Sequence, residues 1–220
     1  MNTYTLNVHF LSPALIGSGE GFGAIIDQDI VFDSVGMPYI PAKRIKGCLL
    51  DAAKDVKDMF SISKINDLSI DLSLFGEQGS PSPGPVYFSN LTMNDYELNK
   101  SWLAYFIQTE EYTDFLSKDL ILDTFTEIRH QTKIDPDSGI AFDHSLRTLR
   151  VLKKGVSFYG DVHIPYAYED ALLPSLLLAC MNFRAMGTGR NRGFGELTCT
   201  LLKGKKILSI ANKLEAICTQ

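Results

Sequence analysis

The pattern of apolar and polar positions predicts a strand at the start of the chain and a helix further on. Between residues 3 and 10, apolar side chains alternate with polar ones, which is the period of a half-buried β-strand. From residue 42 to about residue 56, apolar positions recur every three or four residues, as on one face of an α-helix, and Pro41 stands where a first turn tolerates proline. Between them, the glycine-rich residues 16–23 indicate a loop.

Strand and helix patterns continue on both sides of a long insertion. The predicted elements are strands at 86–92, 156–164 and 197–202, a partly helical region at 94–120, a hairpin at 125–134 and 146–152, and a helix at 167–186. The order β, loop, α, β, long insertion, β, α, β predicts an α+β fold of the elaborated ferredoxin-like (RRM-like) type. No repeat or long linker divides the chain, so we expect a single domain over residues 1–220, with insertions at approximately 57–85 and 94–155.

Composition narrows the class of protein. The chain has 220 residues, of which 45% are hydrophobic and 21% charged, and it shows no run of about 18 apolar residues that would indicate a membrane span. Its start lacks the basic and apolar regions of a signal peptide, and its four cysteines form no CxxC pair. We therefore expect a cytoplasmic globular protein with no membrane partner.

The formal net charge of −5 argues against a protein that coats nucleic acid without specificity. Cations nevertheless concentrate in two stretches without acids, residues 37–50 and 185–195. An acidic protein with such stretches can hold a polyanion at a local site. The basic residues of the first stretch, at the start of the predicted helix, are Lys43, Arg44 and Lys46. Cations are disfavoured at this end of a helix unless an anion is present, which favours an anion-binding role for these three residues. The alternative interpretation is that they lie on a solvated helix face.

The segment GTGRNRGFG at residues 187–195 is the most informative motif. Glycines let the backbone approach a ligand, and successive N–H groups and guanidinium forks favour the oxygens of phosphate. The segment follows a helix and precedes a strand, so it is not a Walker loop. The alternative interpretation is a flexible connector with chance cations. The candidate binding residues are Gly187, Gly189, Arg190, Asn191, Arg192 and Gly193.

Three acids, Asp27, Asp29 and Asp33, follow the first glycine-rich loop at spacings of two and four. Carboxylates near a phosphate path can hold Mg²⁺, which takes one or two carboxylates together with water and phosphate oxygens. The alternative is that these residues belong to the polar face and turn of a half-exposed strand.

Three segments together resemble the CRISPR-associated RAMP superfamily. GTGRNRGFGEL, from residue 187, resembles its glycine-rich loop, and MPYIPAKRIKGCLLDAA at 37–53 resembles its proline-led segment before the first helix. RHQTKIDPDSGIAFDHSLRTLRVLKKG at 129–155 resembles its β-hairpin "thumb". Ala42 departs from the glycine that is frequent in the family.

The resemblance implies a subunit of a type III CRISPR effector, with an RRM-like fold that grips guide CRISPR RNA. Target RNA and other RAMP subunits of the effector are the further partners that it implies. In the related backbone subunit an aspartate before the first helix cuts target RNA with a divalent metal. The matching position is Asp27, with Asp29 as competitor, and Asp27 would hold Mg²⁺ or another divalent ion.

The hairpin offers further RNA contacts, because its cations lie on the arms and its acids cluster at the tip. The candidates are Arg129, His130, Lys133, Arg147 and Arg150. Whether the subunit is an enzyme stays open at this stage. One alternative is a non-catalytic subunit that caps the 5′ handle of the guide, and another is a guide-processing endonuclease that uses His130 for acid–base cleavage. A nucleotide-binding regulatory domain is a third.

Overall fold

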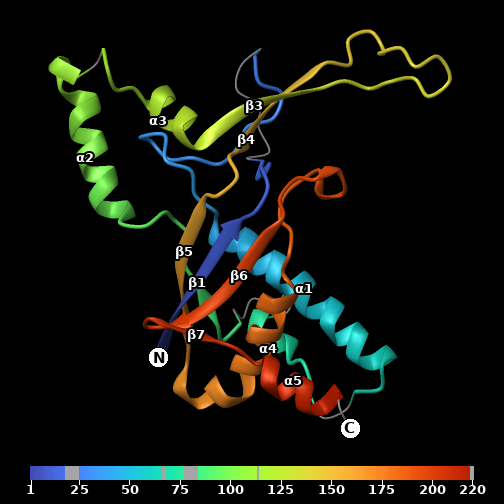
Figure 1. Ribbon diagram of the computed structural model, residues 1–220. Helices are drawn as coiled ribbons and strands as arrows, with labels where there is room; N and C mark the ends of the chain where they lie inside the picture. Colours follow the sequence, from blue (N-terminus) through green and yellow to red (C-terminus); the bar gives the residue numbers. More distant parts are fainter. Residues whose placement is uncertain (18–24, 66–67, 77–83, 113, 219–220) are drawn as a thin grey trace.

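The computed structural model describes residues 1–17, 25–65, 68–76, 84–112 and 114–218, and an antiparallel sheet forms its centre (Figure 1). Within the described residues the strand order of this sheet is β2-β5-β1-β6-β7, and all paired neighbours are antiparallel. The strands are β1 (Asn2–Phe10), β2 (Tyr87–Phe88), β5 (Ser157–Ile164), β6 (Leu197–Lys203) and β7 (Lys206–Leu208). The predicted α+β class is confirmed.

Two helices cover one face of the sheet, α1 (Ala42–Ile62) and α4 (Glu169–Asn182). The alternation in β1 gives the reason, because every second side chain from Tyr4 to Phe10 is buried in a single apolar core that also holds the inner faces of both helices. From α1 and α4 the core takes Ile45, Leu49, Ala53, Val56, Leu172, Leu176 and Ala179. The order β1, α1, β2, insertion, β5, α4, β6 is the order expected from the sequence.

The insertion leaves and rejoins the sheet at one point. Thr92 and Tyr159 exchange two backbone hydrogen bonds of 2.8 and 2.7 Å, so the chain departs and returns at paired residues. Between them lie α2 (Tyr96–Gln108), α3 (Lys118–Phe125) and the hairpin strands β3 (Thr126–Gln131) and β4 (Arg147–Leu152). Figure 1 shows α2 and the hairpin spreading apart at the end of the sheet that is remote from α5 (Ala211–Cys218).

Several element boundaries differ from the predicted ones. Helix α1 continues to Ile62, past the expected end near residue 56, because Phe60 extends its apolar face onto the core. Helix α4 ends at Asn182, and the next residues turn back to pair with the start of β6. The regular ladder of the hairpin is also shorter than predicted, and beyond it Ile134 and Ala141 form an isolated bridge.

No helix in the described part of the chain combines the length and the apolar character needed to cross a lipid bilayer.

Candidate nucleic-acid interface

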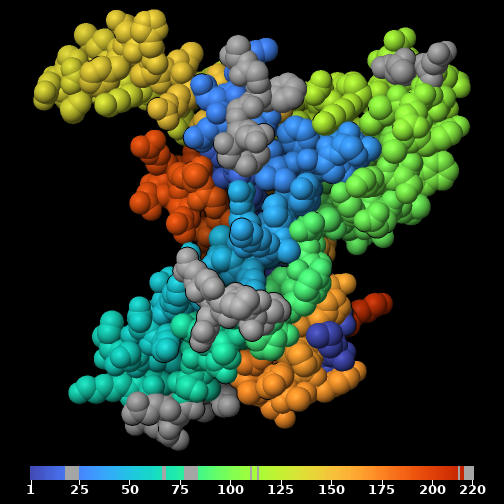
Figure 2. All heavy atoms as spheres, turned by 180° about the vertical axis from the view of Figure 1, so that it is seen from behind, coloured from blue at the N-terminus to red at the C-terminus, as the bar shows by residue number. Residues whose placement is uncertain are grey.

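Cavities meet around the glycine-rich loop and form one continuous recess. The loop–hairpin cavity, of about 840 Å³, lies between the loop and the β4 arm of the hairpin. The Asp27 cavity, of about 500 Å³, continues from it toward the start of α1. The two share Leu15, Gln28, Gly187 and Thr188. Figure 2 shows the loop, in orange, below the hairpin, in yellow, with a recess between them.

The backbone of the loop is fixed from below by the segment that follows β1. The N–H of Thr188 donates to the carbonyl of Leu15 (3.1 Å), and the N–H of Gly195 donates to the carbonyl of Pro13 (2.7 Å). Gly187 has φ +95°, and a Cβ there would lie 2.4 Å from the Leu15 carbonyl oxygen. This glycine therefore serves the packing of the protein itself, in addition to any approach of a ligand.

The tip of the loop presents its polar side chains to solvent. Arg190–Arg192 form a single 3-10 turn between two glycines with left-handed backbone, and all three side chains are exposed. Among the described residues no acidic side chain forms an ion pair with either arginine. Two unpaired guanidinium groups at the mouth of a cavity are suited to binding phosphate.

Asp27 lies beside the base of the hairpin. The N–H of Asp27 donates to the carbonyl of Thr148 in β4 (2.9 Å), and the N–H of Thr148 donates to Oδ2 of Asp27 (2.7 Å). Gln28 continues this contact through a parallel bridge to Leu149. The carboxylate thus lines the Asp27 cavity while it also ties the residue-27 segment to β4.

Asp29 and Arg150 form a buried ion pair. Nη1 of Arg150 lies 2.8 Å from Oδ2 of Asp29, and the two residues are only 8% and 4% exposed, respectively. Burial raises the pKa of Asp29, while the N–H of Ile30 and the Arg150 guanidinium act against that rise. Because this guanidinium is engaged inside the fold, the structure separates Arg150 from the other predicted RNA contacts.

The structure brings part of the predicted site together. Arg147 lines the loop–hairpin cavity, and Arg44 lines the Asp27 cavity next to the loop. The remaining predicted residues stand outside the walls of both cavities: Lys43, Lys46, Arg129, His130, Lys133, Arg150 and Gly193.

Those hairpin residues have local partners of their own. Arg129 pairs with Glu127 at 2.6 Å, and His130 lies 3.3 Å from Oγ1 of Thr148. The Lys133 ammonium sits 4.8 Å from the centre of the Phe142 ring.

The charges around the recess indicate where an anion would lie. Arg44, Arg147, Arg190 and Arg192 line the two cavities, together with the acids Asp27 and Asp29, of which Asp29 is already paired inside the fold. A smaller adjoining cavity of about 300 Å³ runs along α1 and is lined by two acids, Asp51 and Asp55, and by two arginines, Arg184 and Arg190. A phosphate chain is therefore favoured most between loop and hairpin, where the charged lining residues are all arginines, and less along α1, where two acids balance two arginines.

Sequence reasoning missed several residues of the recess: Leu15, Gln28, Gln131, Thr188 and Phe194. Gln28 and Gln131 are polar and stand next to predicted residues, but only the register of β4 against its neighbours brings them to one wall. No three His, Cys, Asp or Glu side chains of the described residues are grouped so that they could hold a metal ion.

Comparison with known proteins places the chain in a family. The model of the RAMP superfamily matches residues 7–198. Among solved structures, a chain of the type III-B Cmr-beta bound to cognate target RNA has a TM-score of 0.64 at 14% identity, and the match covers 93% of this chain and 98% of that chain. A chain of the type III-B Cmr-beta in the apo state has a TM-score of 0.59 at 14% identity and covers 92% and 98%. A search of curated protein sequences finds no significant match.

Proposed function

The chain belongs to the RAMP superfamily, and from this premise we propose that it is an RNA-binding subunit of a type III CRISPR ribonucleoprotein effector. Its fold resembles chains of the type III-B Cmr-beta over nearly their whole length. Guide RNA, target RNA and other effector subunits are the partners that this assignment implies.

The observation that carries the proposal is the arginine-lined recess between the glycine-rich loop and the hairpin. Arg147 from β4 and Arg190 and Arg192 from the loop line the same cavity, although they are far apart in the sequence. Guanidinium groups bind phosphate oxygens through paired N–H donors, and they release counterions from the RNA backbone as they do so. Such contacts fix the position of a guide without reading its sequence.

The replacement of both loop arginines tests this proposal. Arg190→Ala/Arg192→Ala should weaken binding of a guide-length RNA to a similar extent for unrelated sequences. The slope of log affinity against log salt should fall by about 1.4, at about 0.7 per lost contact with a single strand.

Lys205→Ala/Lys206→Ala, two exposed lysines at the β6–β7 turn, is the matched control and should leave the slope unchanged. If the arginine variant binds RNA with the affinity and salt slope of the wild type, the loop is not part of the interface.

Cleavage of target RNA is the finer form of the proposal. Asp27 would be the one carboxylate that holds a divalent ion such as Mg²⁺, because Asp29 is paired with Arg150. Water and phosphate oxygens would then complete the coordination shell of the ion. The ion would supply charge stabilisation at the reacting phosphate. The residues of the chain itself orient the site, since the N–H of Thr148 holds the Asp27 carboxylate at the hairpin base.

The same hydrogen bond favours a second candidate, a binding subunit without nuclease activity that caps the guide. A carboxylate that ties two segments together has a structural role whether or not it takes part in chemistry. Assembly of the effector with Asp27→Asn in place of the wild-type subunit separates the two candidates. The nuclease predicts loss of metal-dependent target cleavage, and the capping subunit predicts no change in it.

A further inference from the structure

Helix α2 carries apolar side chains on two opposite faces. Its inner face, with Leu103, Ala104 and Ile107, packs on a small second core, yet no residue of the helix is fully buried. Its outer face exposes 61% of Leu98, 55% of Trp102 and 57% of Tyr105. A helix that is apolar on both faces is normally covered on both.

The exposed side chains form an ordered stripe. Leu98, Trp102 and Tyr105 stand at positions i, i+4 and i+7, and we call these three residues the α2 stripe. Ring contacts hold it in place, because Trp102 stacks on Phe106 at 5.9 Å between centroids and Phe106 meets Tyr112 edge-on at 5.1 Å. A preordered aromatic surface loses little conformational entropy on binding, and aromatic residues are the frequent anchors of protein interfaces.

The inner side of α2 is locked to the body of the protein. The Tyr96 hydroxyl donates to Oδ2 of Asp33 (2.8 Å), and the Lys100 ammonium lies 3.7 Å from the same oxygen. Burial and then the bond to Asp33 raise the pKa of Tyr96, so its hydroxyl keeps the proton that it donates. The helix is therefore held in one orientation with the α2 stripe facing outward.

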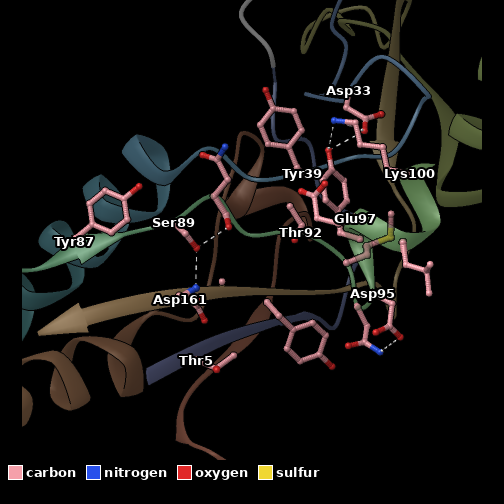
Figure 3. A pocket seen from close by; sticks show the side chains of 17 residues that line it. Thr5, Asp33, Tyr39, Tyr87, Ser89, Thr92, Asp95, Glu97, Lys100 and Asp161 are labelled. Atoms are coloured by element: carbon pink, nitrogen blue, oxygen red, sulfur yellow. Dashed lines mark hydrogen bonds and ion pairs between the residues drawn. The ribbon is translucent and has the colours of Figure 1, made fainter. Parts of the chain in front are cut away.

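The surroundings of the α2 stripe are acidic. Residues 94–117 contain five acidic residues and a single lysine in their sequence, and that lysine is the one paired with Asp33. Next to the stripe a cavity of about 950 Å³ opens between α2 and the edge of the sheet, and its walls include Asp95, Glu97 and Asp161 (Figure 3). Leu98 belongs to both, so stripe and cavity form one surface. Such a surface repels phosphate and attracts cations.

We propose that the α2 stripe and its acidic surroundings are a docking surface for a basic amphipathic helix of a partner protein. The i, i+4, i+7 spacing fits the ridge of a second helix, and the acids complement lysine or arginine on its polar side. Figure 2 shows α2, in green, and the glycine-rich loop on opposite sides of the molecule, so RNA and the partner helix can be bound together. The proposal stands independently of the RNA-binding function.

Trp102 reports directly on this surface, because it is the only tryptophan of the chain. The full chain is titrated with a helical leucine–lysine peptide of about 14 residues, which matches the roughly 20 Å length of α2. The expected result is a saturable blue shift of Trp102 emission with reduced acrylamide quenching. A peptide with every lysine replaced by glutamate should give neither.

Charge-neutralising variants locate the interaction. Asp95→Asn/Glu97→Gln should weaken peptide binding at least about fivefold, since two exposed charge pairs are lost. Asparagine also tolerates the left-handed backbone of residue 95 (φ 52°), so the variant keeps the fold. Asp55→Asn/Asp58→Asn, two exposed acids on α1, is the matched control and should bind within about twofold of the wild type.

Four results would overturn the proposal. The acidic peptide could bind as tightly as the basic one, or the Asp95/Glu97 variant could bind as the wild type does. A Trp102 shift caused by single-stranded RNA would assign the surface to nucleic acid. A shift that follows the concentration of the protein alone, together with a dimer in sedimentation, would assign it to a second copy.

Discussion

The hydrogen bond between Asp27 and Thr148 makes a prediction that separates position from chemistry. Asp27→Ala removes the acceptor of the Thr148 N–H, whereas Asp27→Asn keeps an acceptor oxygen and removes only the charge. A hydrogen bond of this kind contributes about 1 kcal/mol net, so its loss should raise the population of the locally open state at the hairpin base about fivefold. The reverse bond, from the N–H of Asp27 to the Thr148 carbonyl, is kept in both variants.

Amide hydrogen exchange at Thr148 measures this effect. The alanine variant should exchange about fivefold faster than the wild type, and the asparagine variant should stay within about twofold. Guide affinity should follow the same order if a fixed hairpin base supports binding. Equal exchange at Thr148 in all three proteins would refute the anchoring role, and so would an asparagine variant that opens as fast as the alanine one.

Two further predictions concern the hairpin and the loop. Shortening the hairpin between Lys133 and Ser145 should leave the cooperative unfolding transition in place, because the hairpin tip adds little to the core. Capture of target RNA by the assembled complex should fail. Loss of the unfolding transition would show instead that the tip is part of the core. Gly187→Ala should lower the melting temperature by about 4–8 °C, because a Cβ would stand 2.4 Å from a backbone oxygen at a positive φ. Gly193→Ala, with a positive φ and nothing within 4 Å, should lower it by less than half as much, and equal shifts in a thermal melt would contradict the packing argument.

The parts of the fold that depend on local pattern could be predicted from the sequence. The alternation in β1 gave both the strand and its buried face, and the spacing after Pro41 gave the start of α1. The end of α1 could not be predicted in the same way. It depends on Phe60 reaching the core across charged neighbours, which is a tertiary contact.

The candidate site shows the same division. The arginines of the glycine-rich loop were recognisable from their motif, but Arg147 and Arg150 look alike in sequence. They stand three residues apart on one strand and therefore point to opposite faces, so Arg147 lines the cavity while Arg150 is buried against Asp29. The two-residue period of a strand predicts that Arg147 and Arg150 face opposite ways. It does not predict that Asp29 is the buried partner of Arg150, because that contact depends on how the residue-27 segment lies along β4.

The paired exit and return at Thr92 and Tyr159 gives the protein a modular design. Because both ends of the excursion are held together by the sheet itself, a change in the length of the segment between them costs little closure entropy and does not shift the register of β5. That excursion carries both the hairpin arm of the arginine-lined recess and the α2 stripe. New binding partners can therefore be acquired by remodelling one appendage, while the scaffold that folds beneath it stays the same.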